Sequence, residues 1–305
     1  MTTVTQTTTA TPVLQLRAEH QSTPRESIVD GWYRGDKAKT IPAQRIGFPE
    51  FVTGTDKESL LQKRQWVKEH LALCFRMWGK LGYSQGVAGH ITVRDPVLPD
   101  HFWINPFGVH FSAITVSKLV LVGPDGYVSP IGAQLPINEA GFAIHSAIHK
   151  ARPEVNSAAH CHTQYGRAWS VFGKPVEVNN QDATYFYKNQ GIYLDGGRVA
   201  LEADEGQAIA DALGATNRTG ILQNHGLITL GDTCDEAMFL FNTLEKQCQI
   251  QLLVEAAAAG GLKKTVISDK DAEYTVAEMR DPECLYTEIQ PDIELFREKY
   301  PAALL

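Results

Sequence analysis

Three histidines in two distant segments constrain the fold of this chain most strongly. His160 and His162 stand on either side of Cys161, and His225 follows much later in a Gln-Asn-His-Gly run. Side chains on a strand alternate with period two, so a His-x-His segment places both imidazoles on one face. Three imidazoles on one divalent ion leave a coordination position open, which distinguishes catalytic from structural sites. The sequence therefore predicts a metal site at His160, His162 and His225.

Other interpretations of the histidines remain open at this point. Isolated histidines often satisfy hydrogen bonds in a core, and a His-x-His pattern also arises by chance. His145 and His149 form a competing pair, because their i, i+4 spacing puts them on one helix face. Their neighbours are apolar, which favours packing histidines under a sheet. Cys161 is expected to point away from the metal, by strand alternation.

Composition excludes several classes of partner. The chain has 305 residues, 43% hydrophobic and 21% charged, with a net charge of -7. Acidic balance argues against nucleic acid, and no run approaches the roughly 18 apolar residues of a membrane-spanning helix. The N-terminus lacks the apolar core of a signal peptide. The five cysteines contain no CxxC pair and fit free thiols in a reducing compartment. We expect a cytoplasmic protein with no membrane and no nucleic-acid partner.

The chain divides into three regions. Residues 1–45 are polar without a sustained period, as in an arm that is disordered or wraps a neighbour. Residues 46–264 alternate helical and strand-like patterns, which predicts one α/β domain. Residues 265–305 mix charge and proline, and we expect this tail to pack on a neighbouring subunit. The predicted helices cover residues 55–81, 140–151, 205–213 and 233–259, and the predicted strands 90–94, 102–105, 119–122, 157–162, 220–223 and 227–230.

Several blocks of sequence resemble the class II aldolase/adducin family. They occur in order at residues 89–94, 104–108, 119–126, 140–145, 151–155, 160–163 and 224–226. The resemblance covers about residues 56–260. It implies a three-layer α/β/α sandwich with a central mixed β-sheet, in a homotetramer whose active sites lie near subunit interfaces. It also implies a divalent metal, usually Zn²⁺, that polarises the carbonyl of a small-molecule substrate and stabilises an enolate.

The chain departs from the family's aldolases where they hold a substrate phosphate. His90 stands in place of an asparagine, and Phe107 in place of a threonine before Gly108. The paired serines fall on Glu139 and Ala140. A carboxylate repels phosphate. We therefore predict a non-phosphorylated substrate, aromatic or otherwise apolar.

The substrate-binding and catalytic residues implied by the resemblance can be placed by position. The substrate-binding candidates are His90, Asn105, Phe107 and Gly108. The aldolases' acid/base glutamate corresponds to Gly141, which leaves Glu139 as the nearest carboxylate. Glu139 is our candidate for that role, although an acidic residue at a helix start is also favoured by the helix dipole.

Other side chains could also take part in chemistry or binding. Tyr193 is the tyrosine nearest by spacing to a proton donor of the aldolases. Strand packing is the alternative for Tyr193 and for the nearby Tyr185 and Tyr187. Arg167 or Lys188 could bind a substrate carboxylate.

Three functional hypotheses follow. The first is a metal-dependent carbon–carbon lyase of the aldolase type. The second is a non-haem Fe(II) oxygenase or oxidative decarboxylase of aryl-2-oxo acids, since microbial relatives of that kind share the pattern at residues 86–90. The third is a non-catalytic adducin-like assembly protein. Three neutral histidines suit Zn²⁺, which we expect, and also Fe²⁺ or Mn²⁺.

Overall fold

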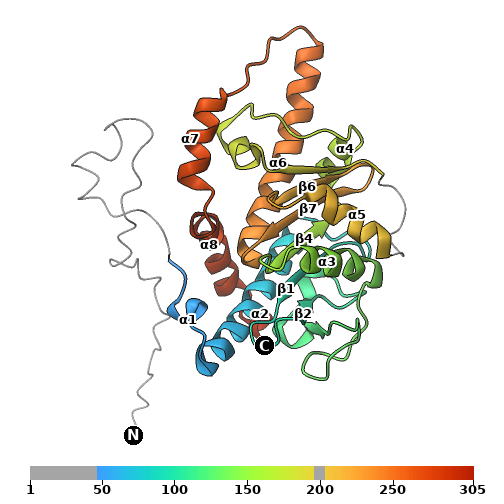
Figure 1. Ribbon diagram of the computed structural model, residues 1–305, viewed down its shortest axis with the longest axis vertical. Coiled ribbons are helices and arrows are strands. Elements are labelled where there is room, and N and C mark those ends of the chain that lie inside the picture. Colours follow the sequence, from blue (N-terminus) through green and yellow to red (C-terminus); the bar gives the residue numbers. More distant parts are fainter. Residues whose placement is uncertain (1–46, 196–202) are drawn as a thin grey trace, which may run out of the picture.

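The chain folds around one mixed β-sheet. The computed structural model describes residues 47–195 and 203–305. In this part of the chain the sheet has the strand order β3-β2-β1-β4-β7-β6-β5 (Figure 1). Only β5 and β6 pair in parallel, and the other neighbours are antiparallel. The strands are β1 His90–Arg94, β2 Phe102–Ile104, β3 Val120–Val122, β4 Ser157–Cys161, β5 Gln190–Tyr193, β6 Thr219–Leu222 and β7 Gly226–Gly231.

Two helices, α3 (Glu139–Ala151) and α5 (Ala203–Leu213), cover one face of the sheet. Asn138 caps α3, because its side chain accepts a hydrogen bond from the Gly141 N–H. The apolar residues of both helices pack with Ala158 of β4 and Ile228 of β7. This second, smaller core therefore lies on the sheet face that carries the side chain of Ala158.

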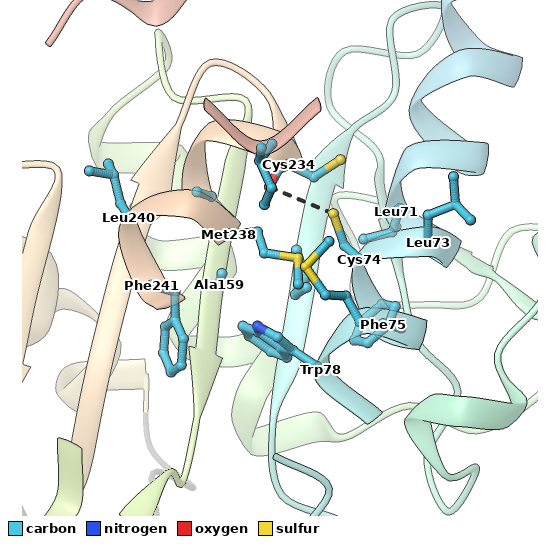
Figure 2. Close-up of a cluster of buried hydrophobic side chains, with 14 of the residues drawn as sticks. Leu71, Leu73, Cys74, Phe75, Trp78, Ala159, Cys234, Met238, Leu240 and Phe241 are labelled. Carbon is cyan, nitrogen blue, oxygen red and sulfur yellow. Dashed lines mark hydrogen bonds between the residues drawn. The ribbon is translucent and has the colours of Figure 1, made fainter. Parts of the chain in front are cut away.

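The long helices α2 (Lys57–Lys80) and α6 (Cys234–Ala259) and the short helix α4 (Gln164–Ser170) cover the opposite face. Figure 2 shows the large side chains of α2 and α6 that meet there, with Trp78 and Phe241 among them. Along β4, Ala159 and Cys161 belong to this main core, whereas Ala158 belongs to the other. The predicted three-layer α/β/α sandwich with a mixed sheet is thus confirmed.

The C-terminal region forms helices that fold onto its own chain. It comprises α7 (Asp269–Met279), α8 (Pro282–Lys299) and η4 (Pro301–Leu304). Helix α8 packs against α6 and α2. In this contact Gln290 donates a hydrogen bond to Asp235, which also pairs with His70 at 2.7 Å. Contact of this tail with a neighbouring subunit stays a prediction, and the predicted N-terminal arm lies outside the described residues.

The remaining short elements connect the layers. They are α1 (Glu50–Thr53), η1 (Phe111–Ala113), η2 (Val116–Lys118) and η3 (Gln181–Phe186). No helix in the described part of the chain has the length and apolar character needed to cross a bilayer.

Candidate metal centre

The three predicted ligand histidines converge at one edge of the sheet. His160 lies near the end of β4, and His162 follows one residue beyond that strand. The ring centroids are 5.1 Å apart for His160 and His162 and 4.8 Å apart for His160 and His225. One ring nitrogen from each of the three lies within 4.8 Å of the others. The fold therefore brings the histidines of the two distant segments close together.

A tight hairpin presents His225. Strands β6 and β7 pair antiparallel with Leu222 opposite Gly226, so only three residues connect them. The His225 N–H donates to the Leu222 carbonyl at 3.0 Å. Asn224 has a φ of 58°, a left-handed conformation that asparagine tolerates better than most residues. This turn directs the His225 ring toward His160 of β4.

The three imidazoles are neutral in the folded chain. Burial is the main cause that lowers the pKa of His160 and His162 and that lowers the pKa of His225 to about 4. His160 Nδ1 is 2.7 Å from the Leu227 carbonyl oxygen. A carbonyl can only accept, so Nδ1 carries the proton and Nε2 presents a lone pair. A backbone carbonyl behind a histidine is the usual support for a metal ligand.

The residues present fit a divalent cation. Metal-bound histidine must be neutral, and all three are. The Nδ1 atom of His225 is buried and has no hydrogen-bond partner. An unsatisfied buried nitrogen of this kind costs about 1–3 kcal/mol. Coordination of an ion through this Nδ1 atom, or a hydrogen-bond partner that a bound ligand brings to it, would remove that cost.

A buried carboxylate fixes the chain just after the ligand strand. Glu245 of α6 accepts hydrogen bonds from Thr163 Oγ1 at 2.5 Å and from the N–H groups of Tyr165 at 2.9 Å and Gly166 at 2.6 Å. It thereby caps the start of α4, immediately after His162. Our sequence reasoning missed Glu245. The sequence carries no local signal for it, because Glu245 stands among other polar residues of α6 such as Asn242, Thr243 and Lys246.

The predicted substrate-binding residues lie close to this edge. His90 of β1 is the cross-strand partner of His160, and the two ring centroids are 5.1 Å apart. Asn105 donates to the Gly89 carbonyl at 3.4 Å, and its own Oδ1 is buried without a partner. Asn105 and Gly108 line a small cavity whose wall contains no lysine or arginine. Phe107, which lies between Pro106 and Gly108 in the sequence, does not line this cavity and is 42% exposed.

The two catalytic candidates are less closely tied to the histidines. Glu139 is exposed in the first turn of α3, and in the described part of the chain no hydrogen bond joins it to the three histidines. Tyr193 is buried on β5, within the apolar cluster that includes Ile144 and Leu222. The roles assigned to Glu139 and Tyr193 stay predictions.

The other polar candidates separate into two groups. Tyr185 bonds to Glu288, while Tyr187 and Lys188 both contact Glu273, so all three serve the C-terminal helices. Arg167 is exposed on α4, and after burial its charge is the next cause that lowers the pKa of His162. Of the two candidate carboxylate-binding cations, Arg167 is therefore the one near the histidines.

Comparison with known proteins identifies the family. The family model for the Class II Aldolase and Adducin N-terminal domain matches residues 69–252. The chain belongs to the class II aldolase/adducin family. Members of the class II aldolase group generally depend on a divalent metal, typically Zn²⁺, which agrees with the donor set described above.

Relatives of this class II aldolase/adducin chain carry diverse names. The Meiotically up-regulated gene 14 protein of Schizosaccharomyces pombe is 42% identical over 250 residues, which cover 82% of this chain and 94% of that protein. The 4-hydroxy-3-prenylphenylpyruvate oxygenase/4-hydroxy-3-prenylbenzoate synthase of Streptomyces roseochromogenus subsp. oscitans is 38% identical over 66% of this chain and 72% of that protein. A solved structure, L-fuculose 1-phosphate aldolase from Glaciozyma antarctica PI12, is 38% identical with a TM-score of 0.74, covering 83% of this chain and 97% of that one.

Proposed function

We propose that this protein is a metal-dependent carbon–carbon lyase of the aldolase type, acting on a non-phosphorylated, aromatic or apolar carbonyl compound. The observation that carries the proposal is the convergence of three neutral imidazoles within 4.8 Å, one of them with its lone pair fixed by a backbone carbonyl. The ion would be held by His160, His162 and His225, with Zn²⁺ first and Fe²⁺ or Mn²⁺ as alternatives. When bound, such an ion polarises a carbonyl and stabilises the negative charge of an enolate.

Features around the histidines support the choice of substrate. The cavity beside Asn105 has no lysine or arginine in its wall, so it offers a phosphate dianion no strong countercharge. Phe107, the sequence neighbour of two residues that line the cavity, is exposed and would provide an aromatic surface for an apolar substrate. Arg167, one turn beyond His162, supplies a cation for one carboxylate.

We further propose a cytoplasmic homotetramer with its active site near a subunit interface. All five cysteines are free thiols, as expected in a reducing compartment. Val87 and Phe107, both near the cavity, expose apolar side chains in the single chain. A neighbouring subunit that covers them would complete the walls of the site.

Two other functions have a specific observation in their favour. The 38% identity with a prenylphenylpyruvate oxygenase supports oxidative decarboxylation of an aryl-2-oxo acid, and a three-histidine site accepts Fe²⁺ as well as Zn²⁺. The equal identity with a protein named L-fuculose 1-phosphate aldolase supports a sugar-phosphate substrate. The adducin-like alternative requires no reaction at all.

Metal analysis is the first test of the proposal. Protein purified without added metal should contain about one ion of Zn²⁺ per chain, and His160→Ala should lose it. His101→Ala is the matched control, because His101 lies outside the site and pairs with Asp100. Stoichiometric metal in the His160→Ala protein would refute the site.

Substrate assays separate the remaining candidates. We expect retro-aldol cleavage of aryl-substituted hydroxy-oxo acids and no cleavage of L-fuculose 1-phosphate. Oxygen consumption with aryl-pyruvates by the iron-loaded protein would instead establish the oxygenase. Cleavage of the sugar phosphate would contradict the predicted substrate class, and an inert, metal-free protein would favour the assembly role.

A further inference from the structure

A chain of hydrogen bonds runs from the α3 layer of the protein to the metal-site edge of the sheet. His149 Nδ1 is 3.1 Å from the Val155 carbonyl oxygen, and its Nε2 is 2.8 Å from Thr92 Oγ1. The same hydroxyl is 2.8 Å from His145 Nδ1, and His145 Nε2 is 3.0 Å from His90 Nδ1. The four side chains that form these hydrogen bonds are all buried.

The Val155 carbonyl sets the direction of every bond in this chain. A carbonyl only accepts, so His149 must carry its proton on Nδ1 and offer a lone pair at Nε2. The Thr92 hydroxyl has one proton, which therefore goes to His149, and its oxygen accepts from His145 Nδ1. His145 Nε2 is then a lone pair, which requires the proton on Nδ1 of His90.

This assignment of protons requires that the histidines are neutral, and their burial keeps them neutral. Burial is the main cause that lowers the pKa of His145, and it lowers the pKa of His149 to about 3. A neutral ring carries one proton. Because His90 has its proton on Nδ1, its Nε2 is left as a bare lone pair.

That Nε2 atom lies against Gly141 of α3, on the sheet face that also carries His160. In the described part of the chain no hydrogen bond is made to it, and it is not among the polar atoms sealed from solvent, although His90 is only 3% exposed. The His90 ring also lies over Gly141, where an added Cβ would be 2.2 Å from Nε2. Only a glycine at position 141 leaves room for the imidazole in this orientation.

We propose that His90 is a specificity-determining residue whose Nε2 accepts a hydrogen bond from a hydroxyl of the ligand bound at the three-histidine site. The ligand class is then an α-hydroxy carbonyl or α-hydroxy carboxylate compound, or the enol of a 2-oxo acid, with its O–H beside the metal-bound oxygen. This inference rests on the proposed function. It adds that the site selects for ligands with a hydrogen-bond donor next to His90 Nε2. A ligand without that donor would leave the Nε2 lone pair unpaired and would bind less well.

The tautomer is tested without metal, ligand or activity. Two-bond ¹H–¹⁵N correlation spectra of metal-free protein labelled at histidine distinguish Nδ1–H from Nε2–H rings, and His90→Ala assigns the His90 signal. We expect the Nδ1–H form for His90, His145 and His149. An Nε2–H ring at His90 would overturn the inference, whatever the outcome for the metal site.

The selectivity is tested by calorimetry with mandelate and O-methylmandelate on zinc-loaded protein. The wild type should prefer mandelate. In His90→Ala this preference should fall about fivefold, the value of one ordinary hydrogen bond, with the zinc content unchanged. Gly141→Ala, which keeps His90 but displaces its ring, should lose the same preference. His101→Ala is the matched control and should keep it.

The outcomes separate this inference from the proposed function. Equal weakening of both ligands in His90→Ala would indicate a structural role and refute it. Loss of zinc in His90→Ala would make His90 a metal ligand and also refute it. Unchanged zinc in His160→Ala would refute the proposed metal site, while the tautomer measurement would still decide the state of His90.

Discussion

At the scale of single residues, Glu245 shows how one buried carboxylate positions a ligand on another element. It is 4% exposed and accepts three hydrogen bonds from the residues that follow His162. Two of the three donors are N–H groups at the start of α4, where a helix has unpaired donors and favours negative charge. The direction in which the chain leaves β4 therefore depends on a residue of α6.

Glu245→Gln is predicted to loosen this connection. The amide group has one acceptor oxygen for three donors, and its NH₂ would face an N–H or a hydroxyl. We expect a loss of unfolding free energy of about 1–3 kcal/mol and weaker zinc binding through a less ordered His162. Denaturant melts and zinc titration measure the two effects. Glu255→Gln on the same helix, where the carboxylate is 41% exposed, should change stability by less than about 0.5 kcal/mol.

Residues 90 and 141 also belong to this scale. The sequence shows two separate departures from the aldolase pattern, a histidine at 90 and a glycine at 141. In the fold they are one feature, because the His90 ring fills the space that a side chain at Gly141 would occupy. Nothing in the sequence pairs these positions, which meet only when α3 packs on β1.

At the scale of elements, the β6–β7 hairpin places the third histidine. Its three-residue connection depends on Asn224 in the left-handed region, with a φ of 58°. The turn brings the His225 ring centroid to 4.9 Å from that of His162. The geometry of one turn therefore decides whether the metal site is complete.

Substitutions of Asn224 should separate turn geometry from side-chain chemistry. Asn224→Gly keeps access to positive φ and should preserve both stability and zinc affinity. Asn224→Val should cost about 1–2 kcal/mol, because a β-branched residue is strained in that conformation, and should weaken zinc binding. Thermal melts with and without zinc test this. Equal behaviour of the two variants would contradict the role of the turn.

How far the sequence predicts the elements depends on the strength of the local signal. The helices predicted at 140–151 and 233–259 match α3 and α6 to within one residue, because periodicity and capping residues agree there. The C-terminal helices escaped prediction, since Pro291 lies inside α8 and proline normally breaks a helix. Packing against α6 and α2 overrides that local preference.

The site was predictable to a similar, partial extent. Strand alternation was enough to group His160 and His162, the Gln-Asn-His-Gly run supplied His225 as a third candidate, and the resemblance supported the full set. The hydrogen-bond chain behind His90 and the cap made by Glu245 join residues far apart in sequence. Such tertiary contacts leave no local periodicity to detect.

At the scale of the whole molecule, the buried histidines make the metal-free protein sensitive to acid. Burial is the largest cause lowering the pKa of each of His90, His145, His149, His160, His162 and His225. The unfolded chain binds these protons from about pH 6.5 downward, while the folded chain resists them, His149 to about pH 3. Stability therefore falls as the pH drops below 6.5.

One buried carboxylate, that of Glu236, changes stability with pH in the opposite direction. Burial raises the pKa of Glu236 to about 7 from 4.5, with Asp232 and Asp281 adding to the rise and Arg218 opposing it. Glu236 keeps its proton to a higher pH in the folded chain than in the unfolded chain. The stability that the protonated Glu236 contributes is therefore lost as the pH rises from 4.5 to 7. Six histidines outweigh one glutamate, and the net slope of stability with pH stays positive.

Glu236→Gln should steepen that slope. Glutamine resembles the protonated acid and can still accept the Asp232 N–H hydrogen bond that Glu236 makes at 2.7 Å. The stability gained between pH 4.5 and 7.5 should increase on the order of 3 kcal/mol relative to wild type, at about 1.4 kcal/mol per pKa unit. Denaturant melts of metal-free protein across this range provide the measurement. The exposed Glu298→Gln serves as control, and identical profiles for all three proteins would refute the assignment.

The alternation of β4 also separates two kinds of reactivity within the molecule. His160 shares its face with Ala158, whereas Cys161 is buried in the main core and bonds to the Tyr83 carbonyl at 3.1 Å. Burial raises the pKa of the Cys161 thiol to about 12, so the sulfur stays protonated and unreactive toward electrophiles. Oxidants and alkylating agents consequently meet no thiolate beside the metal ligands. The cysteine between the two ligand histidines is therefore poorly suited to act as a redox switch for this site.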